Sequence, residues 1–160
     1  MQAPPAIEGM LLHGILHRVE GDFDNTRAWV GDVRDACEGF VPKRKESGEM
    51  LEKDVVEKMR GKEGVGKTLM GYVYGDGDES GLTDDVEAFR KQKSGQRTAE
   101  EEGALEARIR TELERILQWC REKFGEGEWK DATSAWVKNS EEVSKMSADM
   151  VSGGKGFRDF

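Results

Sequence analysis

A long amphipathic pattern between residues 98 and 124 is the feature that most constrains the fold of this chain. Thr98 and Glu101 have the spacing of a capping box, in which a hydroxyl and a carboxylate each bond an unpaired backbone amide at the start of a helix. Gly125 provides a suitable stop. The residues between them keep one face apolar over several turns: Leu105, Ile109, Leu113, Ile116, Leu117, Cys120 and Phe124. The pattern predicts one helix over 98–124.

Weaker patterns with the same period predict further helices. They cover residues 6–20, 25–38, 47–60, 84–93, 129–136 and 140–151. Residues 61–83 carry seven glycines, which indicates an irregular segment with at most a short strand at 69–74. The expected fold is all-α, a single helical domain over 1–160 built as an irregular helical bundle of about five to seven helices with a glycine-rich loop excursion. We expect the first helix and the long helix to form the core.

The charge and the cysteine content narrow the range of functions. A net charge of −8 at pH 7 disfavours nucleic-acid binding, which requires a basic surface. Cys37 and Cys120 are too few for a disulfide framework and are not spaced as a zinc motif. No apolar run approaches the roughly 20 residues that span a bilayer, and the N-terminus lacks the basic region of a signal peptide. We expect a soluble cytoplasmic protein with no nucleic-acid or membrane partner.

The stretch LHGILHRVEGDFDN, residues 12–25, contains both histidines of the chain. At about 100° per residue, His13, His17 and Glu20 fall within about 60° of one another on a helical wheel. They form a polar edge beside a separate apolar arc, which consists of Leu11, Leu12, Ile15, Leu16 and Val19. The stretch therefore predicts a group of polar side chains at the margin of the packed face.

This polar edge has the composition of a metal site. Two histidines at i and i+4 can bind one ion, and a carboxylate one turn later can be a third ligand. The predicted ligands are His13, His17 and Glu20, a set that suits Zn²⁺ or Fe²⁺ with open positions for a small-molecule substrate. Asp22 would then orient a histidine, and Arg18 would receive an anionic group of the substrate.

Two other interpretations of the same stretch need no metal. A histidine oriented by Glu20 or Asp22 can act as a general base near neutral pH. Alternatively the cluster is structural, because Asp22 and Asn25 are residue types that tight turns and helix N-caps use. In that case the chain is a non-catalytic helical interaction module for a protein partner. Whether the protein is an enzyme stays open on the sequence.

A second motif, GKEGVGKT at 61–68, matches the phosphate-binding loop at Gly61, Gly66, Lys67 and Thr68. Such a loop follows a buried strand and leads into a helix, so that backbone amides and the helix dipole face the phosphates. Here the preceding residues LEKDVVEKMR read as a charged amphipathic helix, and the following residues soon reach glycines and acids. A surface loop is favoured, with a nucleotide site as the remote alternative.

Residues 12–29 resemble the signature H-x-I-x-H-R-x-E-x-D-x-x-N-x-x-x-W of an uncharacterised family of helical proteins from bacteria and fungi. The matching positions are His13, Ile15, His17, Arg18, Glu20, Asp22, Asn25 and Trp29. Many members have aromatic residues where this chain has Leu12 and Ala28, so a side pocket is expected to be smaller here. The resemblance implies an all-α fold and a site on the polar edge of the first helix. Members tend to carry helical sequence before the motif, so we expect a shortened member.

Overall fold

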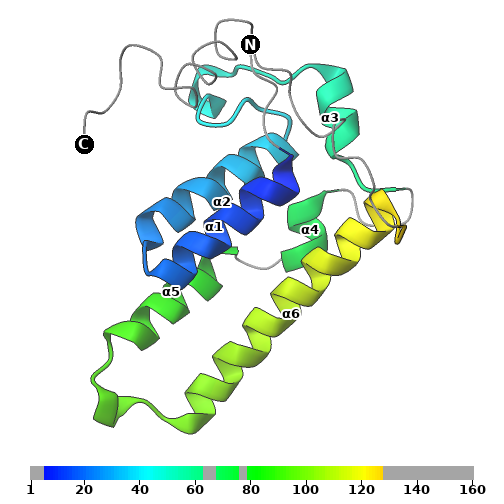
Figure 1. Cartoon of the computed structure of the whole chain (residues 1–160). Helices are drawn as coiled ribbons and strands as arrows, with labels where there is room; N and C mark the ends of the chain where they lie inside the picture. Colours follow the sequence, from blue (N-terminus) through cyan, green and yellow to red (C-terminus); the bar gives the residue numbers. More distant parts are fainter. Residues whose placement is uncertain (1–5, 63–67, 76–78, 128–160) are drawn as a thin grey trace, which may run out of the picture. The chain divides into compact units, whose positions relative to one another are not determined.

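The computed structural model describes residues 6–62, 68–75 and 79–127 (Figure 1). Its α-helices are α1 (Ile7–Glu20), α2 (Phe23–Cys37), α3 (Lys53–Met59), α4 (Leu69–Tyr74), α5 (Glu79–Lys91) and α6 (Ala99–Phe124). Short 3-10 turns cover Lys45–Ser47 and Ser94–Gln96. Within the described residues no strand forms, and Phe40 and Met50 make only an isolated antiparallel bridge. The predicted all-α fold is confirmed.

Most of the predicted helices are present, some with changed boundaries. The first two predicted helices and the long helix correspond to α1, α2 and α6. The pattern at 47–60 forms the shorter α3, and the helix predicted at 84–93 begins earlier, as α5. The helices predicted at 129–136 and 140–151 lie outside the described residues.

The glycine-rich segment is less irregular than predicted. A strand at 69–74 is wrong, because these residues form α4. The hydroxyl of Thr68 accepts a hydrogen bond from the backbone amide of Gly71, at 3.1 Å, and so caps the first turn of this helix. Three of its side chains are buried: Leu69, Met70 and Val73. The loop excursion predicted at 61–83 therefore contains α4 and the first residues of α5.

α1 and α2 form a tight helical hairpin and lie side by side (Figure 1). Gly21 ends α1 in the left-handed region, with φ of 89°, which favours glycine. Asp22 then caps α2, since its side chain accepts a hydrogen bond from the backbone amide of Asn25 at 3.2 Å. A Cβ at Gly14 would lie 3.1 Å from the Cβ of Trp29, so this glycine allows the two helices to approach closely.

α6 runs antiparallel to α1. In the first turn of α1, Oε1 of Glu8 accepts hydrogen bonds from Nε1 of Trp119 at 2.8 Å and from Nζ of Lys123 at 2.6 Å. In the last turn of α1, Arg18 pairs with Glu112. The start of α1 therefore meets the end of α6, and the end of α1 meets the middle of α6.

Four helices of the unit Pro5–Glu126 share the core. α1 packs most extensively on α2, while α4 contacts both α2 and α6. The first helix and the long helix contribute as expected, and α2 and α4 contribute alongside them. The buried apolar residues are Ile7, Met10, Leu11, Ile15, Val30, Val33, Ala36, Leu69, Met70, Val73, Ile116 and Trp119.

Candidate functional site

The two histidines lie on one edge of α1, next to α2. Their Nε2 atoms are 3.1 Å apart. The ring of His13 stacks on the indole of Trp29, with ring centroids 4.4 Å apart. His13 is exposed and His17 is partly buried. The i and i+4 spacing thus brings the two imidazoles into direct contact, with one of them held against an aromatic side chain of α2.

The second ring nitrogen of His17 faces two carboxylates. Nδ1 lies 3.5 Å from Oε2 of Glu20 and 3.8 Å from Oδ2 of Asp22. It makes no hydrogen bond within the described part of the chain. Two nearby negative charges favour a proton on Nδ1, which leaves Nε2 as an acceptor or a ligand. Glu20 therefore lies beside the ring nitrogen that faces away from the Nε2 pair.

The described residues contain no group of three or more His, Cys, Asp or Glu side chains that could hold a metal ion. The three ligands expected from the sequence are brought into one region, but not around one point. His13 and His17 share the Nε2 contact, whereas Glu20 approaches Nδ1 of His17. Any ion on this edge would thus depend on the two histidines and on ligands from outside them.

Asp22 and Asn25 are engaged in the turn between α1 and α2. Nδ2 of Asn25 donates to Oδ2 of Asp22 at 2.6 Å, and the backbone amide of Asn25 donates to Oδ1 at 3.2 Å. These hydrogen bonds, the side-chain one above all, hold the pKa of Asp22 below its ordinary value. The geometry is that of a helix N-cap, in line with the structural interpretation of these two residues.

Arg18 is buried rather than directed to a substrate. Its guanidinium binds both carboxylate oxygens of Glu112 in α6, with Nη1 at 3.1 Å from Oε1. The hydroxyl of Tyr74 in α4 donates to the same Oε1 at 2.7 Å. Arg18 therefore joins α1 to α6, and its buried guanidinium does not support the predicted contact with an anionic group of a substrate.

Glu112 is a partner that sequence reasoning misses, although a signal exists. It lies three residues after Ile109 and four before Ile116, so it falls within the apolar stripe of the long helix. A carboxylate in such a stripe is rarely buried without a partner. Tyr74 has no comparable signal, because it lies in a helix of six residues.

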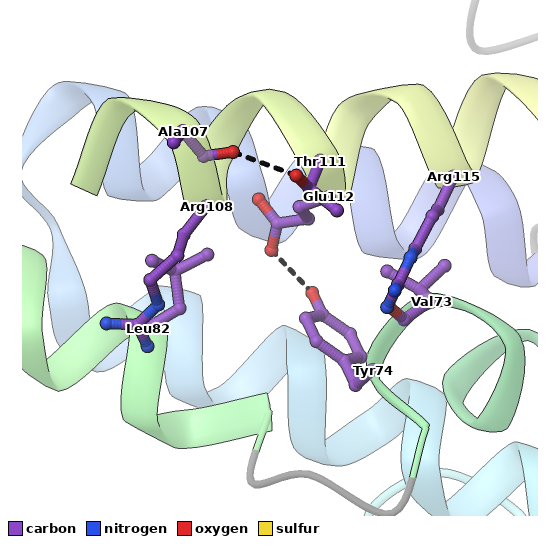
Figure 2. Close-up of a pocket in the computed structure, with 8 residues that line it drawn as sticks. All are labelled: Val73, Tyr74, Leu82, Ala107, Arg108, Thr111, Glu112 and Arg115. Carbon is purple, nitrogen blue, oxygen red and sulfur yellow. Dashed lines mark hydrogen bonds between the residues drawn. The ribbon is translucent and has the colours of Figure 1, made fainter. Parts of the chain in front are cut away.

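A cavity of about 410 Å³ opens beside this ion pair, between α4, α5 and α6 (Figure 2). Its volume lies in the range of small-molecule sites, about 300–1,000 Å³. The residues that line it are Val73, Tyr74, Leu82, Ala107, Arg108, Thr111, Glu112 and Arg115.

The polar side chains of this cavity are already bonded within the protein. Figure 2 shows the hydroxyl of Tyr74 directed at Glu112. Three other side chains of the lining donate hydrogen bonds within the protein: Thr111 to the carbonyl of Ala107, Arg115 to the carbonyl of Val73, and Arg108 to the carboxylate of Asp85. A specific site needs polar groups that converge on the ligand. Each polar side chain of the described lining is bonded to another group of the protein, so these hydrogen bonds alone do not indicate which class of ligand the cavity would bind.

The phosphate-binding-loop motif has an unsuitable setting. Gly61 and Thr68 are described, whereas Gly66 and Lys67 lie outside the described residues. The element before the motif is the helix α3, not a strand, and the Thr68 hydroxyl caps a short helix. These flanks agree with the interpretation of a surface loop.

Several large apolar side chains stay exposed on α1 and α6. Of the apolar arc predicted for the first helix, Leu11 and Ile15 are buried. The exposed side chains are Leu12 (45%), Leu16 (53%) and Val19 (63%) on α1, and Leu113 (42%), Leu117 (52%) and Phe124 (42%) on α6. Within the described residues, no helix is long and apolar enough to cross a membrane.

Five of these side chains, all except Phe124 at the end of α6, are considered together because they lie on one side of α1 and α6. On α1, Glu8 and Arg18 reach α6. The residues that touch α2, such as Gly14, lie on one side of them around the helix, and the exposed apolar residues lie on the other side. On α6, Arg115 bonds to α4, and the exposed leucines lie on the opposite side. Because α2 and α4 contact each other, they cover the same side of α1 and α6. We call the opposite surface the α1/α6 apolar face: Leu12, Leu16, Val19, Leu113 and Leu117.

Two contacts between α1 and α6 give the register of the two helices. Glu8 meets Trp119, and Arg18 meets Glu112. With an equal rise per residue along both helices, the positions between these contacts can be paired. The residues at similar heights are Leu12 with Leu117 and Leu16 with Leu113. The exposed leucines of the two helices therefore lie at similar heights along the two helices.

Comparisons with known proteins add no relative. No protein-family model, curated protein or solved structure matches the chain. The resemblance of residues 12–29 to a helical family signature stays a prediction.

Proposed function

We propose that this chain is a non-catalytic interaction module that binds an amphipathic helix of a partner on the α1/α6 apolar face. The observation that supports it is that this one face holds five of the seven large apolar side chains that are exposed among the described residues. Scattered apolar residues are normal on a protein surface, but a contiguous set of them marks an interaction site. Two parallel or antiparallel helices offer the shallow groove into which a third helix lays its apolar side.

In this proposal the sequence motif on α1 serves the scaffold. Asp22 and Asn25 fix the turn into α2, and Arg18 ties α1 to α6 through Glu112. Both contacts hold α1 in the position from which its outer side forms half of the face. We place the module in a reducing compartment such as the cytoplasm, because Cys37 and Cys120 are unpaired thiols.

The test uses a fluorescent synthetic helix with leucines on one side and lysines and glutamines on the other. Lysines are chosen because the chain has a net charge of −8. We expect fluorescence anisotropy to show binding with a Kd of roughly micromolar size. Leu16→Asp places a charge on the face and should weaken binding by about tenfold or more, because burying an unpaired carboxylate is costly.

Met50→Asp is the matched control, since Met50 is 59% exposed but lies outside the face. It should leave the affinity for the peptide unchanged. The proposal is wrong if the wild-type chain does not bind the peptide, or if Leu16→Asp and Met50→Asp bind it equally. Circular dichroism of each variant establishes that the helices are retained.

A second candidate function is the binding of a divalent metal ion, Zn²⁺ or Fe²⁺, by the histidine pair. The 3.1 Å between the Nε2 atoms favours it. Two imidazole nitrogens that bind one ion at about 2.0–2.1 Å with ordinary angles lie about 3.0–3.4 Å apart. Glu20 and Asp22 approach Nδ1 of His17, where carboxylates commonly orient a metal-bound imidazole. The remaining positions would take water or a small-molecule ligand.

Calorimetric titration of Zn²⁺ into protein without a histidine tag tests this candidate. The chain has two histidines, so His13→Ala and His17→Ala should each abolish the high-affinity step. Glu20→Gln should weaken it by about tenfold, as a carboxylate that orients a ligand. Substoichiometric binding, or equal binding by the histidine variants, would eliminate the candidate.

A further inference from the structure

The cavity between α4, α5 and α6 has one charge in its lining that no ion pair neutralises. Its charged side chains are Arg108, Glu112 and Arg115. Arg108 pairs with Asp85 at 2.6 Å, and Glu112 pairs with the buried Arg18. Arg115 makes no ion pair with any residue that the structure describes. The lining and its direct partners therefore carry one unbalanced positive charge, which is that of Arg115.

A bond to α4 holds the guanidinium of Arg115 at the cavity rather than in open solvent. Its Nη1 donates to the carbonyl of Val73, a buried residue, at 2.7 Å. Figure 2 shows Arg108 and Arg115 extending from α6 on either side of the hydrogen bond between Tyr74 and Glu112. A guanidinium has five N–H donors, and the bond to the carbonyl uses one of them. Arg115 can therefore donate to a ligand without giving up its contact with α4.

Apolar side chains from three helices form much of the remaining lining. Val73 of α4 and Leu82 of α5 are buried, and Ala107 contributes from α6. Apolar surface that a ligand removes from water here gains roughly 25 cal/mol per Å². A mostly apolar wall with few polar groups is the usual arrangement of small-molecule sites, and here the unbalanced charge adds a preference for an anion.

We infer that this cavity binds a small organic acid, whose carboxylate pairs with Arg115 and whose apolar part lies against Val73 and Leu82. A carboxylate matches the planar fork of a guanidinium and can accept two of its hydrogen bonds. One negative charge balances the one positive charge, whereas a phosphate dianion would add an unpaired charge to a chain of net charge −8. The site uses no residue of the α1/α6 apolar face or of the histidine pair, so the inference goes beyond the proposed function.

Titration of hexanoate into the isotope-labelled full chain, followed by two-dimensional NMR, tests the inference. The backbone amide signals of Tyr74, Leu82 and Thr111 should shift to saturation, with a Kd of roughly 0.1–1 mM. The affinity is modest because the net negative charge of the chain repels anions at longer range. Hexanol has the same apolar chain without the carboxylate, and it should bind about tenfold more weakly or worse.

Two variants on α6 test the role of the charge. Arg115→Gln keeps a polar side chain but removes the charge, so it should weaken hexanoate binding by about tenfold and leave hexanol binding unchanged. Arg110→Gln is the matched control. Arg110 is also exposed on α6, but it lies about 140° around the helix from Arg115 and outside the lining. It changes the net charge equally and should leave the affinity for hexanoate unchanged.

A third variant tests the cavity without changing any charge. Ala107→Phe substitutes an exposed side chain of the lining, so the fold should be retained, and the added ring would occupy the space of the apolar part of the acid. Hexanoate binding should fall by about tenfold or more. The dispersion of signals in each spectrum establishes that the variants are folded.

Four results would overturn the inference. Hexanoate could cause no saturable shifts at the lining, or hexanol could bind as tightly as hexanoate. Arg115→Gln and Arg110→Gln could bind hexanoate equally, which would remove the role of the charge. Binding that Ala107→Phe leaves unchanged would place the acid outside the cavity.

Discussion

Two ion-pair clusters join helices that are far apart in the chain, and they differ chiefly in burial. Arg18 of α1 pairs with Glu112 of α6, and their side chains are 5% and 3% exposed. Arg27 of α2 pairs with Asp84 and Glu87 of α5, and these side chains are 37%, 54% and 19% exposed. The chemistry of the groups is the same, so the comparison isolates the effect of the surroundings.

Burial changes what each charge does for the fold. Two buried ions lose their hydration, so the complete pair adds little to stability, but the loss of one partner leaves an uncompensated charge in the interior. An exposed pair gains little when it forms and loses little when it breaks. We therefore expect the buried pair to determine which part of α6 meets α1, and the exposed cluster to support a contact that packing has already set.

The largest expected effect follows from removing one member of the buried pair. Glu112→Ala should lower the free energy of unfolding by about 3–5 kcal/mol, because Arg18 would remain buried without a counter-charge. Arg18→Ala should have an effect of similar size. Urea denaturation followed by circular dichroism measures both.

The double variant Arg18→Met with Glu112→Leu distinguishes a lost charge from a lost contact. It removes both ions and fills the space with apolar atoms, so it should be closer to the wild type than either single variant. If the double variant instead loses the sum of the two single losses in free energy of unfolding, Arg18 and Glu112 are not energetically coupled. Burial would then not explain the difference between the two clusters.

The exposed cluster should show a much smaller effect. Arg27→Ala should lower the free energy of unfolding by less than about 1 kcal/mol, although it breaks contacts with two carboxylates of α5 and with Asp24 of its own helix. Repeating the measurement in 1 M salt should reduce the difference further, because the screening length is then about 3 Å. A loss as large as that of Glu112→Ala would show that burial is not what distinguishes the clusters.

Sequence reasoning identifies the members of the buried pair only as exceptions to a pattern. Arg18 follows Leu11 by seven residues and Ile15 by three, which puts it on the buried side of α1, and Glu112 has the equivalent place on α6. Their assignment to each other depends on the order and direction of the helices, which no local pattern contains. For the same reason, a motif that groups Arg18 with the histidines leads to a substrate-binding role that the structure does not support.

The helices themselves were predictable where the period extends over several turns. α1, α2 and α6 have such periods, and Thr98 marks the start of α6 through its capping box. α4 is six residues long, which is too short for the spacing of apolar residues to distinguish a helix from a strand. The hydrogen bond from Gly71 to the Thr68 hydroxyl favours the helix. At the candidate site, the contact between the histidines follows from their spacing, whereas the stacking of His13 on Trp29 depends on how α2 packs.

The smallest expected effect is a pH dependence within the exposed cluster. Hydrogen bonds from Lys91 and then from Arg27 hold the pKa of Glu87 below its ordinary value of 4.5. A carboxyl with a lowered pKa in the folded state binds its proton less readily there than in the unfolded chain. Its contribution to stability is therefore complete above pH 4.5 and is lost as the pH falls through the folded-state pKa.

Urea denaturation of the wild type and of Glu87→Gln across this range measures the contribution. The two free energies of unfolding should differ at neutral pH and converge as the solution becomes acidic, because the wild-type carboxyl is then protonated as well. Lys91→Met removes the hydrogen bond that lowers the pKa of Glu87 most. In that background, the difference in free energy of unfolding between Glu87 and Glu87→Gln should change less with pH. The difference in free energy of unfolding between wild type and Glu87→Gln could instead persist unchanged below the folded-state pKa. The Glu87 side chain would then stabilise α5 by packing, and the exposed cluster would act through contact rather than through charge.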